Sequence, residues 1–270
     1  MVEERHIGEV FIKTYTEDSN KHLLFFLPGQ SMSPRAFWDF VLDDESTHAS
    51  YFCDNGIDVV LFDPVGYGKS TAYYPYDRIA YAEQIKFALK TIQKKYLTKT
   101  IVGFSTTTAP AILVKDHFDK VVIHSPSVRN DFKYNTMHNA DFETGIDKLK
   151  KSRLEQISDK LIPEPNRILG WEEKIVAIMG TTWKVPAQVV YDINNYWVRH
   201  RKHGFYPDPA KEIFAIVGQY DYEITTGGYE NFLQMFTHTQ EIVIPNSTHF
   251  SMWENEFAKL RKILVEIACL

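Results

Sequence analysis

Apolar residues along this chain gather in short runs, and polar or turn-forming residues separate one run from the next. Runs that are short and rich in Val, Ile, Leu and Phe are typical of strands buried on both faces. They lie at Val10–Ile12, Leu23–Leu27, Ile57–Phe62, Thr100–Phe104, Val121–Ile123, Ile213–Gly218 and Glu241–Pro245. We therefore predict that these segments are the strands of one sheet.

Between several of these runs, apolar residues recur at the spacing of helices. From about Tyr76 to Tyr96 they repeat at three- and four-residue intervals, and the segment from Ala109 to His117 also indicates a helix. A C-terminal helix carries on one face Phe257, Leu260, Leu264 and Ile267. Buried strands that alternate with amphipathic helices predict the α/β class, with a mostly parallel sheet flanked by helices.

The middle of the chain has a different composition. From about Val128 to Ala210 the sequence is helical in composition, rich in mixed charge, and contains Trp171, Trp183 and Trp197. No linker sets this segment apart as an independent domain. We therefore expect residues 1–127 and 211–270 to form one core, with residues 128–210 as a helical insertion.

Composition narrows the class of protein. With 270 residues, of which 44% are hydrophobic and 24% charged, the chain has the make-up of a soluble globular protein. A net charge of −5 gives no reason to expect a nucleic-acid partner. The charged N-terminus leads into no apolar core segment, and no apolar run is long enough to span a membrane. We expect a cytoplasmic protein without a membrane span.

Few residues suggest a metal site. Cys53 and Cys269 are isolated in the sequence, and we expect both to be small buried apolar residues rather than ligands. His200 and His203 have a helical spacing but lie among basic residues, which favours a solvated face. The sequence therefore predicts no metal ion.

The segment from Thr100 to Ala109 carries the most specific chemistry. A strand-like run ends in Gly103-Phe104-Ser105, and small residues that can begin a helix follow at once. This is the outline of a nucleophile elbow, in which a serine projects from a sharp strand-to-helix turn. Thr107 stands where the usual pattern has its second glycine. Taken alone, the pattern also fits a serine that merely caps a helix.

A serine nucleophile needs a base, and the base needs an orienting acid. In an open parallel sheet, ligands gather beyond the carboxyl ends of the strands. Asp221 lies just past the strand at Ile213–Gly218, and His249 lies just past the last strand. Asp221 can also be read as a turn residue and His249 as a surface-loop residue, and Glu223 is a rival for the acid.

A nucleotide-binding loop is the other motif to consider. Gly68-Lys69-Ser70 has the end of that motif, which requires a glycine five residues before its Gly-Lys pair. Asp63 occupies that position and its charge would repel phosphate. We reject the nucleotide-binding interpretation.

Taken together, these motifs resemble the α/β-hydrolase superfamily over almost the whole chain. The chain order of Ser105, Asp221 and His249 is that of the superfamily. The segment from Phe62 to Ser70 resembles its Asp-x-x-Gly-x-Gly-x-Ser sequence, whose role is structural. Leu27-Pro28-Gly29-Gln30 resembles its His-Gly-x turn, with Pro28 in place of the histidine.

The resemblance implies a role for each residue. Ser105 would be the nucleophile, His249 the base and Asp221 the acid, and the backbone N–H groups of Gln30 and Thr106 would form the oxyanion hole. The insertion at residues 128–210 would be a cap over the nucleophile, with substrate contacts from Trp171, Trp183 or Trp197. No metal or organic cofactor is implied.

The implied activity is hydrolysis of a carboxylic ester or a related small acyl compound. The same triad could serve a thioesterase, a lactonase, a C–C hydrolase or a cyanohydrin lyase. A haloalkane dehalogenase is disfavoured because its nucleophile is an aspartate. The departures at Pro28 and Thr107 leave open a non-catalytic protein that binds a small ligand. The sequence specifies no oligomeric state.

Overall fold

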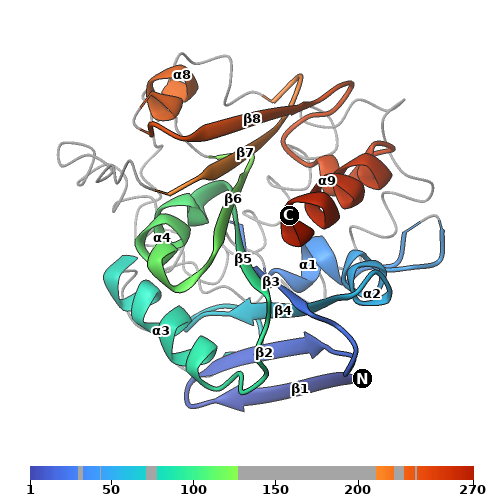
Figure 1. Ribbon diagram of the computed structural model, residues 1–270, viewed down its shortest axis with the longest axis vertical. Coiled ribbons are helices and arrows are strands. Elements are labelled where there is room, and N and C mark those ends of the chain that lie inside the picture. The colour runs from blue at the N-terminus through green and yellow to red at the C-terminus, as the bar shows by residue number, and fades with distance from the viewer. Residues whose placement is uncertain (30–32, 43, 71–77, 127–210, 222–227, 235) are drawn as a thin grey trace, which may run out of the picture.

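The computed structural model describes residues 1–29, 33–42, 44–70, 78–126, 211–221, 228–234 and 236–270. In this part of the chain one sheet has eight strands in the order β1-β2-β4-β3-β5-β6-β7-β8 (Figure 1). The strands are β1 (Val2–Ile7), β2 (Val10–Tyr15), β3 (His22–Phe26), β4 (Ile57–Asp63), β5 (Thr98–Phe104), β6 (Lys120–His124), β7 (Ile213–Gly218) and β8 (Thr239–Ile244). From β4 through β3 to β8 every neighbouring pair is parallel, and the pairs β1–β2 and β2–β4 are antiparallel. The predicted mostly parallel sheet is confirmed.

Helices cover both faces of this sheet. They are α1 (Arg35–Trp38), α2 (His48–Asp54), α3 (Arg78–Lys90), α4 (Thr108–Leu113), α8 (Gly228–Leu233) and α9 (Phe257–Cys269), with short 3₁₀ turns η1 (Ser105–Thr107), η2 (Lys115–His117) and η7 (Ser251–Trp253). α1, α2 and α9 lie on one side of the sheet, and α3 and α4 lie on the other (Figure 1). No helix in the described ranges is both long and apolar enough to cross a membrane.

Two apolar clusters, one on each face, account for the unbroken hydrophobic runs. Successive side chains of a strand point to opposite faces. In β3, Leu24 and Phe26 join the cluster under α2 and α9, whereas Leu23 and Phe25 join the cluster under α3 and α4. A strand buried on both sides needs an apolar residue at nearly every position, and this made the central strands recognisable in the sequence.

The predicted helix at Tyr76–Tyr96 is shorter than expected. α3 ends at Lys90, and the helix prediction is wrong beyond it. Ile92 and Tyr96 still pack against the same apolar cluster. However, the Tyr96 hydroxyl and the Lys94 ammonium group each donate to Oδ2 of buried Asp58 at 2.9 Å. Lys94 and Tyr96 thus make these contacts near the start of β4 from a segment that follows the end of α3.

The cysteine prediction holds for one residue only. Cys53 is buried, where its Sγ lies near the Asn20 side chain. Cys269 is exposed, because it is the last residue of α9 and lies at the free end of that helix. The expectation that both cysteines are buried is therefore wrong for Cys269.

Candidate active site

Ser105 lies at the turn between β5 and α4, where backbone conformation and packing are unusual. Its φ is +54°, in the left-handed region that residues other than glycine seldom adopt. A Cβ on Gly103 would lie 2.9 Å from the Thr107 carbonyl oxygen and 2.8 Å from the Ala111 Cβ. Helix and strand approach so closely here that only glycine fits at position 103. Such strain is typical of functional sites, where the surrounding structure holds it.

Thr107, which departs from the usual elbow pattern, has a clear structural role. Its hydroxyl accepts a hydrogen bond from the Phe104 N–H at 2.9 Å and donates to the Phe104 carbonyl at 3.0 Å. The hydroxyl therefore satisfies both backbone groups of the residue that precedes Ser105. A threonine at this position ties the turn together by its side chain.

The structure brings Ser105, His249 and Asp221 together from three different segments. The Ser105 Oγ lies 3.1 Å from Nε2 of His249, and Nδ1 of His249 lies 3.1 Å from both carboxylate oxygens of Asp221. Ser105 follows β5, Asp221 follows β7, and His249 follows β8. All three are buried, with Ser105 the most accessible at 8% exposure.

These contacts fix the direction of proton transfer. An ionised carboxylate only accepts hydrogen bonds, so Nδ1 of His249 carries the proton that it donates to Asp221. The lone pair of Nε2 then faces the Ser105 hydroxyl. A neutral imidazole in this tautomer is arranged to take the serine proton.

Of the other predicted site residues, Thr106 is the one that the structure describes. Thr106 follows Ser105 and is buried, and its Oγ1 has no hydrogen-bond partner among the described residues. Outside the described residues lie Gln30, Glu223, Trp171, Trp183, Trp197 and the whole predicted cap at 128–210. Next to Gln30, a Cβ on Gly29 would meet the Phe104 ring at 2.6 Å. The backbone before residue 30 thus packs directly on the residue before Ser105.

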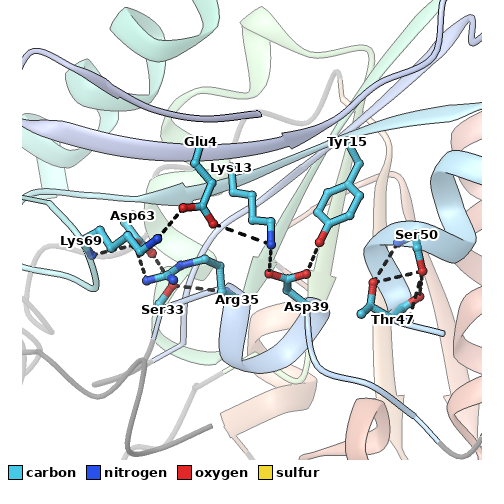
Figure 2. Close-up of polar contacts among 10 residues, drawn as sticks. All are labelled: Glu4, Lys13, Tyr15, Ser33, Arg35, Asp39, Thr47, Ser50, Asp63 and Lys69. Atoms are coloured by element: carbon cyan, nitrogen blue, oxygen red, sulfur yellow. Dashed lines mark hydrogen bonds and ion pairs between the residues drawn. The ribbon is translucent and has the colours of Figure 1, made fainter. Parts of the chain in front are cut away.

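Asp63 anchors the loop that resembles Asp-x-x-Gly-x-Gly-x-Ser (Figure 2). Its carboxylate accepts from the Lys69 N–H at 3.0 Å, from the Arg35 guanidinium at 3.2 Å and from the Ser33 hydroxyl. Gly68 has a φ of +47°, and a Cβ there would lie 2.1 Å from Oδ2 of Asp63. Asp63 therefore joins the turn after β4 to Ser33 and Arg35, at and just before the start of α1. Burial raises the pKa of Asp63, and Arg35 and these hydrogen bonds oppose that rise.

Two buried histidines that the sequence analysis missed support the segment that carries His249. Nε2 of His124, at the end of β6, lies 2.7 Å from the Ser251 hydroxyl. Nε2–H of His48 donates to the Met252 carbonyl at 2.8 Å, and its Nδ1 accepts from Nε of Arg261 at 3.2 Å. Burial lowers the pKa of each imidazole to about 3, and for His48 the nearby charge of Arg261 adds to the effect.

Comparison with solved structures identifies the fold. No protein-family profile matches the chain, and no curated protein matches it. An esterase from Exiguobacterium antarcticum has 16% identity and a TM-score of 0.67, over 97% of this chain and 96% of that one. Epoxide hydrolase A from Mycobacterium thermoresistibile has 12% identity and a TM-score of 0.73, over 98% of both chains. The thioesterase domain of the curacin biosynthetic pathway has 11% identity and a TM-score of 0.67, over 100% of both chains.

The chain therefore has the α/β-hydrolase fold, as its resemblance to that superfamily implies. One fold carries many reactions, so the activity has to be argued from the site.

Proposed function

We propose that this protein is a serine hydrolase of carboxylic esters or related acyl compounds. The observation that carries the proposal is the unbroken chain of contacts from Ser105 through His249 to Asp221. Structural similarity to an esterase and a thioesterase domain supports hydrolase chemistry in general. A protein that only binds a ligand has no need for a strained serine aligned with a base and an acid.

In the proposed reaction, Ser105 Oγ forms a bond to the carbonyl carbon while Nε2 of His249 takes the hydroxyl proton. The carbonyl oxygen gains a negative charge, which the backbone N–H groups of Thr106 and Gln30 would stabilise. The tetrahedral intermediate expels the alcohol, which receives the proton from His249. Water, deprotonated by His249, then attacks the acyl-enzyme, and the second tetrahedral intermediate releases the carboxylic acid as His249 gives its proton back to Ser105 Oγ. Asp221 holds the imidazole and stabilises its charged form throughout.

Labelling with a fluorophosphonate tests the nucleophile, because this reagent forms a covalent bond with an activated serine. The wild-type protein should be labelled at Ser105, and Ser105→Ala should abolish both labelling and ester hydrolysis, by several orders of magnitude in kcat/KM. Ser125→Ala is a matched control, since Ser125 is also buried, follows the neighbouring strand and has a φ of +47°. Labelling that persists in Ser105→Ala, or no labelling of the wild type, would contradict the proposal.

The acyl class is a separate question, which a substrate panel answers. We expect hydrolysis of p-nitrophenyl esters of some chain length, and the panel should include acyl-CoA and lactone substrates. The C–C hydrolase and cyanohydrin lyase alternatives predict labelling at Ser105 without turnover of this panel. The ligand-binding alternative predicts neither labelling nor turnover.

We propose that residues 128–210 form a cap that selects the substrate. Trp171, Trp183 and Trp197 would supply an apolar roof that excludes water. Replacing each by alanine should, for at least one of them, change the ratio of kcat/KM between short and long esters by about 1–3 kcal/mol, the scale of one lost pocket contact. An unchanged ratio in three folded variants would assign these tryptophans to packing within the insertion.

A further inference from the structure

His249 sits in a loop that is held by a buried acid outside the proposed triad. The loop, residues 245–254, begins after β8 and ends at Glu254. Glu254 is fully buried, and its carboxylate lies against the two residues that come just before His249. The proposed mechanism gives this carboxylate no proton to transfer and no contact with substrate.

Three donors from these two residues converge on the Glu254 carboxylate. The Thr248 N–H donates to Oε2 at 2.9 Å, and the Thr248 hydroxyl donates to Oε1 at 2.6 Å. The Ser247 hydroxyl also donates to Oε2. Because all these groups are donors, the arrangement suits an ionised carboxylate, which only accepts.

The opposite side of Thr248 is in contact with the strand that leads to Asp221. A Cβ on Gly218 would lie only 2.2 Å from the Thr248 carbonyl oxygen. The Tyr220 N–H donates to the Ser247 carbonyl at 2.8 Å. The backbone just before His249 is therefore fixed between Glu254 on one side and the end of β7 on the other.

Burying a carboxylate is costly unless hydrogen bonds compensate. Burial raises the pKa of Glu254, the hydrogen bonds from Ser247 and Thr248 oppose the rise, and the charge of Asp221 adds to it. An apolar residue at position 254 would avoid the burial of a charge but would leave the Thr248 N–H and two hydroxyls without their acceptor. The acid is the group that satisfies all three donors at once.

We propose, on the basis of the proposed function, that Glu254 is a positioning residue that holds His249 between Ser105 and Asp221. It acts through Thr248, whose backbone and side chain it fixes. Both ring nitrogens of His249 must keep their partners at 3.1 Å, so a small displacement of position 248 would misalign the base. Misplacement of a catalytic group by about 1 Å costs roughly 100-fold in rate.

Glu254→Gln tests this inference, because it keeps the shape but offers an amide to the same donors. We expect kcat for p-nitrophenyl butyrate to fall at least tenfold while KM stays within twofold. Asp58→Asn is the matched control. Asp58 is equally buried, and it accepts from Lys94, from Tyr96 and from the Glu17 N–H at the other end of the sheet. It should lose stability but keep kcat within twofold, measured well below the melting temperature.

Thr248→Val provides a milder change in case Glu254→Gln does not fold. It removes the hydroxyl bond of 2.6 Å to Glu254 and the longer contact of 3.5 Å from the Phe250 N–H, and kcat should fall about two- to tenfold. In both variants, the NMR signal of the His249 Nδ1 proton, assigned with His249→Gln, should weaken or shift. An unchanged kcat and signal in these variants would overturn the inference, as would an equal loss of kcat in Asp58→Asn.

The two proposals fail in different ways. A wild-type protein that fluorophosphonate does not label would refute the proposed function. The Nδ1 proton signal of His249, compared between wild type and Thr248→Val, would still show whether Glu254 and Thr248 hold the imidazole.

Discussion

Asp221 is assigned as the acid because it alone among the described acidic residues reaches the His249 ring, with both oxygens 3.1 Å from Nδ1. Asp221→Asn should lower kcat/KM about 10⁴-fold, since an amide favours the wrong imidazole tautomer and lacks the stabilising charge. Glu223→Gln, a change at the rival acid, should have a much smaller effect. Steady-state kinetics of both variants on one p-nitrophenyl ester provide the measurement. A larger loss in Glu223→Gln would reassign the acid.

The sequence predicted which residues meet but not what holds them. Ser105, Asp221 and His249 could be found because each follows a recognisable strand, and parallel strands end at one edge of a sheet. Glu254 gave no comparable pattern, and its partners are set by the folded loop. His124 directly follows the apolar run Val121–Ile123, but the sequence does not show that it meets Ser251 in that loop. The one available indication that Glu254 is buried was its position directly after the apolar sequence Met252-Trp253.

The elbow between β5 and α4 depends on the Thr107 hydroxyl, which binds both backbone groups of Phe104. Thr107→Val keeps the size of the side chain but leaves these buried groups without that partner. We expect a loss of about 1–3 kcal/mol in the free energy of unfolding, measured by urea denaturation. Thr106→Val is the adjacent control. Its Oγ1 has no partner among the described residues, so its stability should change little. Equal effects of the two substitutions would contradict this role.

Among secondary-structure elements, the strands buried on both faces were the most predictable, and the sequence analysis missed β1, α2 and the end of α3. β3 to β7 appear in the sequence as continuous apolar runs because helices cover both sides of the sheet. β1 was missed because it is mostly exposed and its sequence, Val2–Ile7, is mainly charged and contains no apolar run like the one that marks β8. α2 is short and shows its start only through the capping box of Thr47 and Ser50, which is visible in Figure 2. The predicted helix that corresponds to α3 extended too far, because Ile92 and Tyr96 pack against the same apolar cluster as the helix although they lie beyond its end.

The stability of the whole molecule should depend on pH through His48 and His124, two imidazoles that are fully buried in the described part of the chain. The pKa of His48 and that of His124 are each lowered from 6.5 to about 3 by burial. The unfolded chain therefore binds protons at these sites below pH 6.5, whereas the folded chain does not until near pH 3. Their contribution to stability is fully present above pH 6.5 and is lost as the pH falls toward 3.

Two buried carboxyls act in the opposite direction. Burial raises the pKa of Asp63 and that of Glu254, so their protonation favours the folded state as the pH falls. The pH dependence of the unfolding free energy therefore combines opposing contributions. The contribution of an imidazole is best separated by replacing that histidine in a protein that keeps both carboxyls. His124→Gln is suitable, because its amide nitrogen can approach Ser251 as Nε2 does now.

In the wild type, an imidazole whose pKa is 6.5 in the unfolded chain and about 3 in the folded protein should account for about 2 kcal/mol of the stability lost between pH 7 and pH 5. The difference in unfolding free energy between those pH values should consequently be smaller by about 2 kcal/mol in His124→Gln. His238→Gln, which changes an exposed imidazole before β8, should leave that difference unchanged. Urea denaturation of the three proteins at both pH values supplies the measurement. If His124→Gln loses as much stability on acidification as the wild type, protonation of His124 does not drive the acid sensitivity.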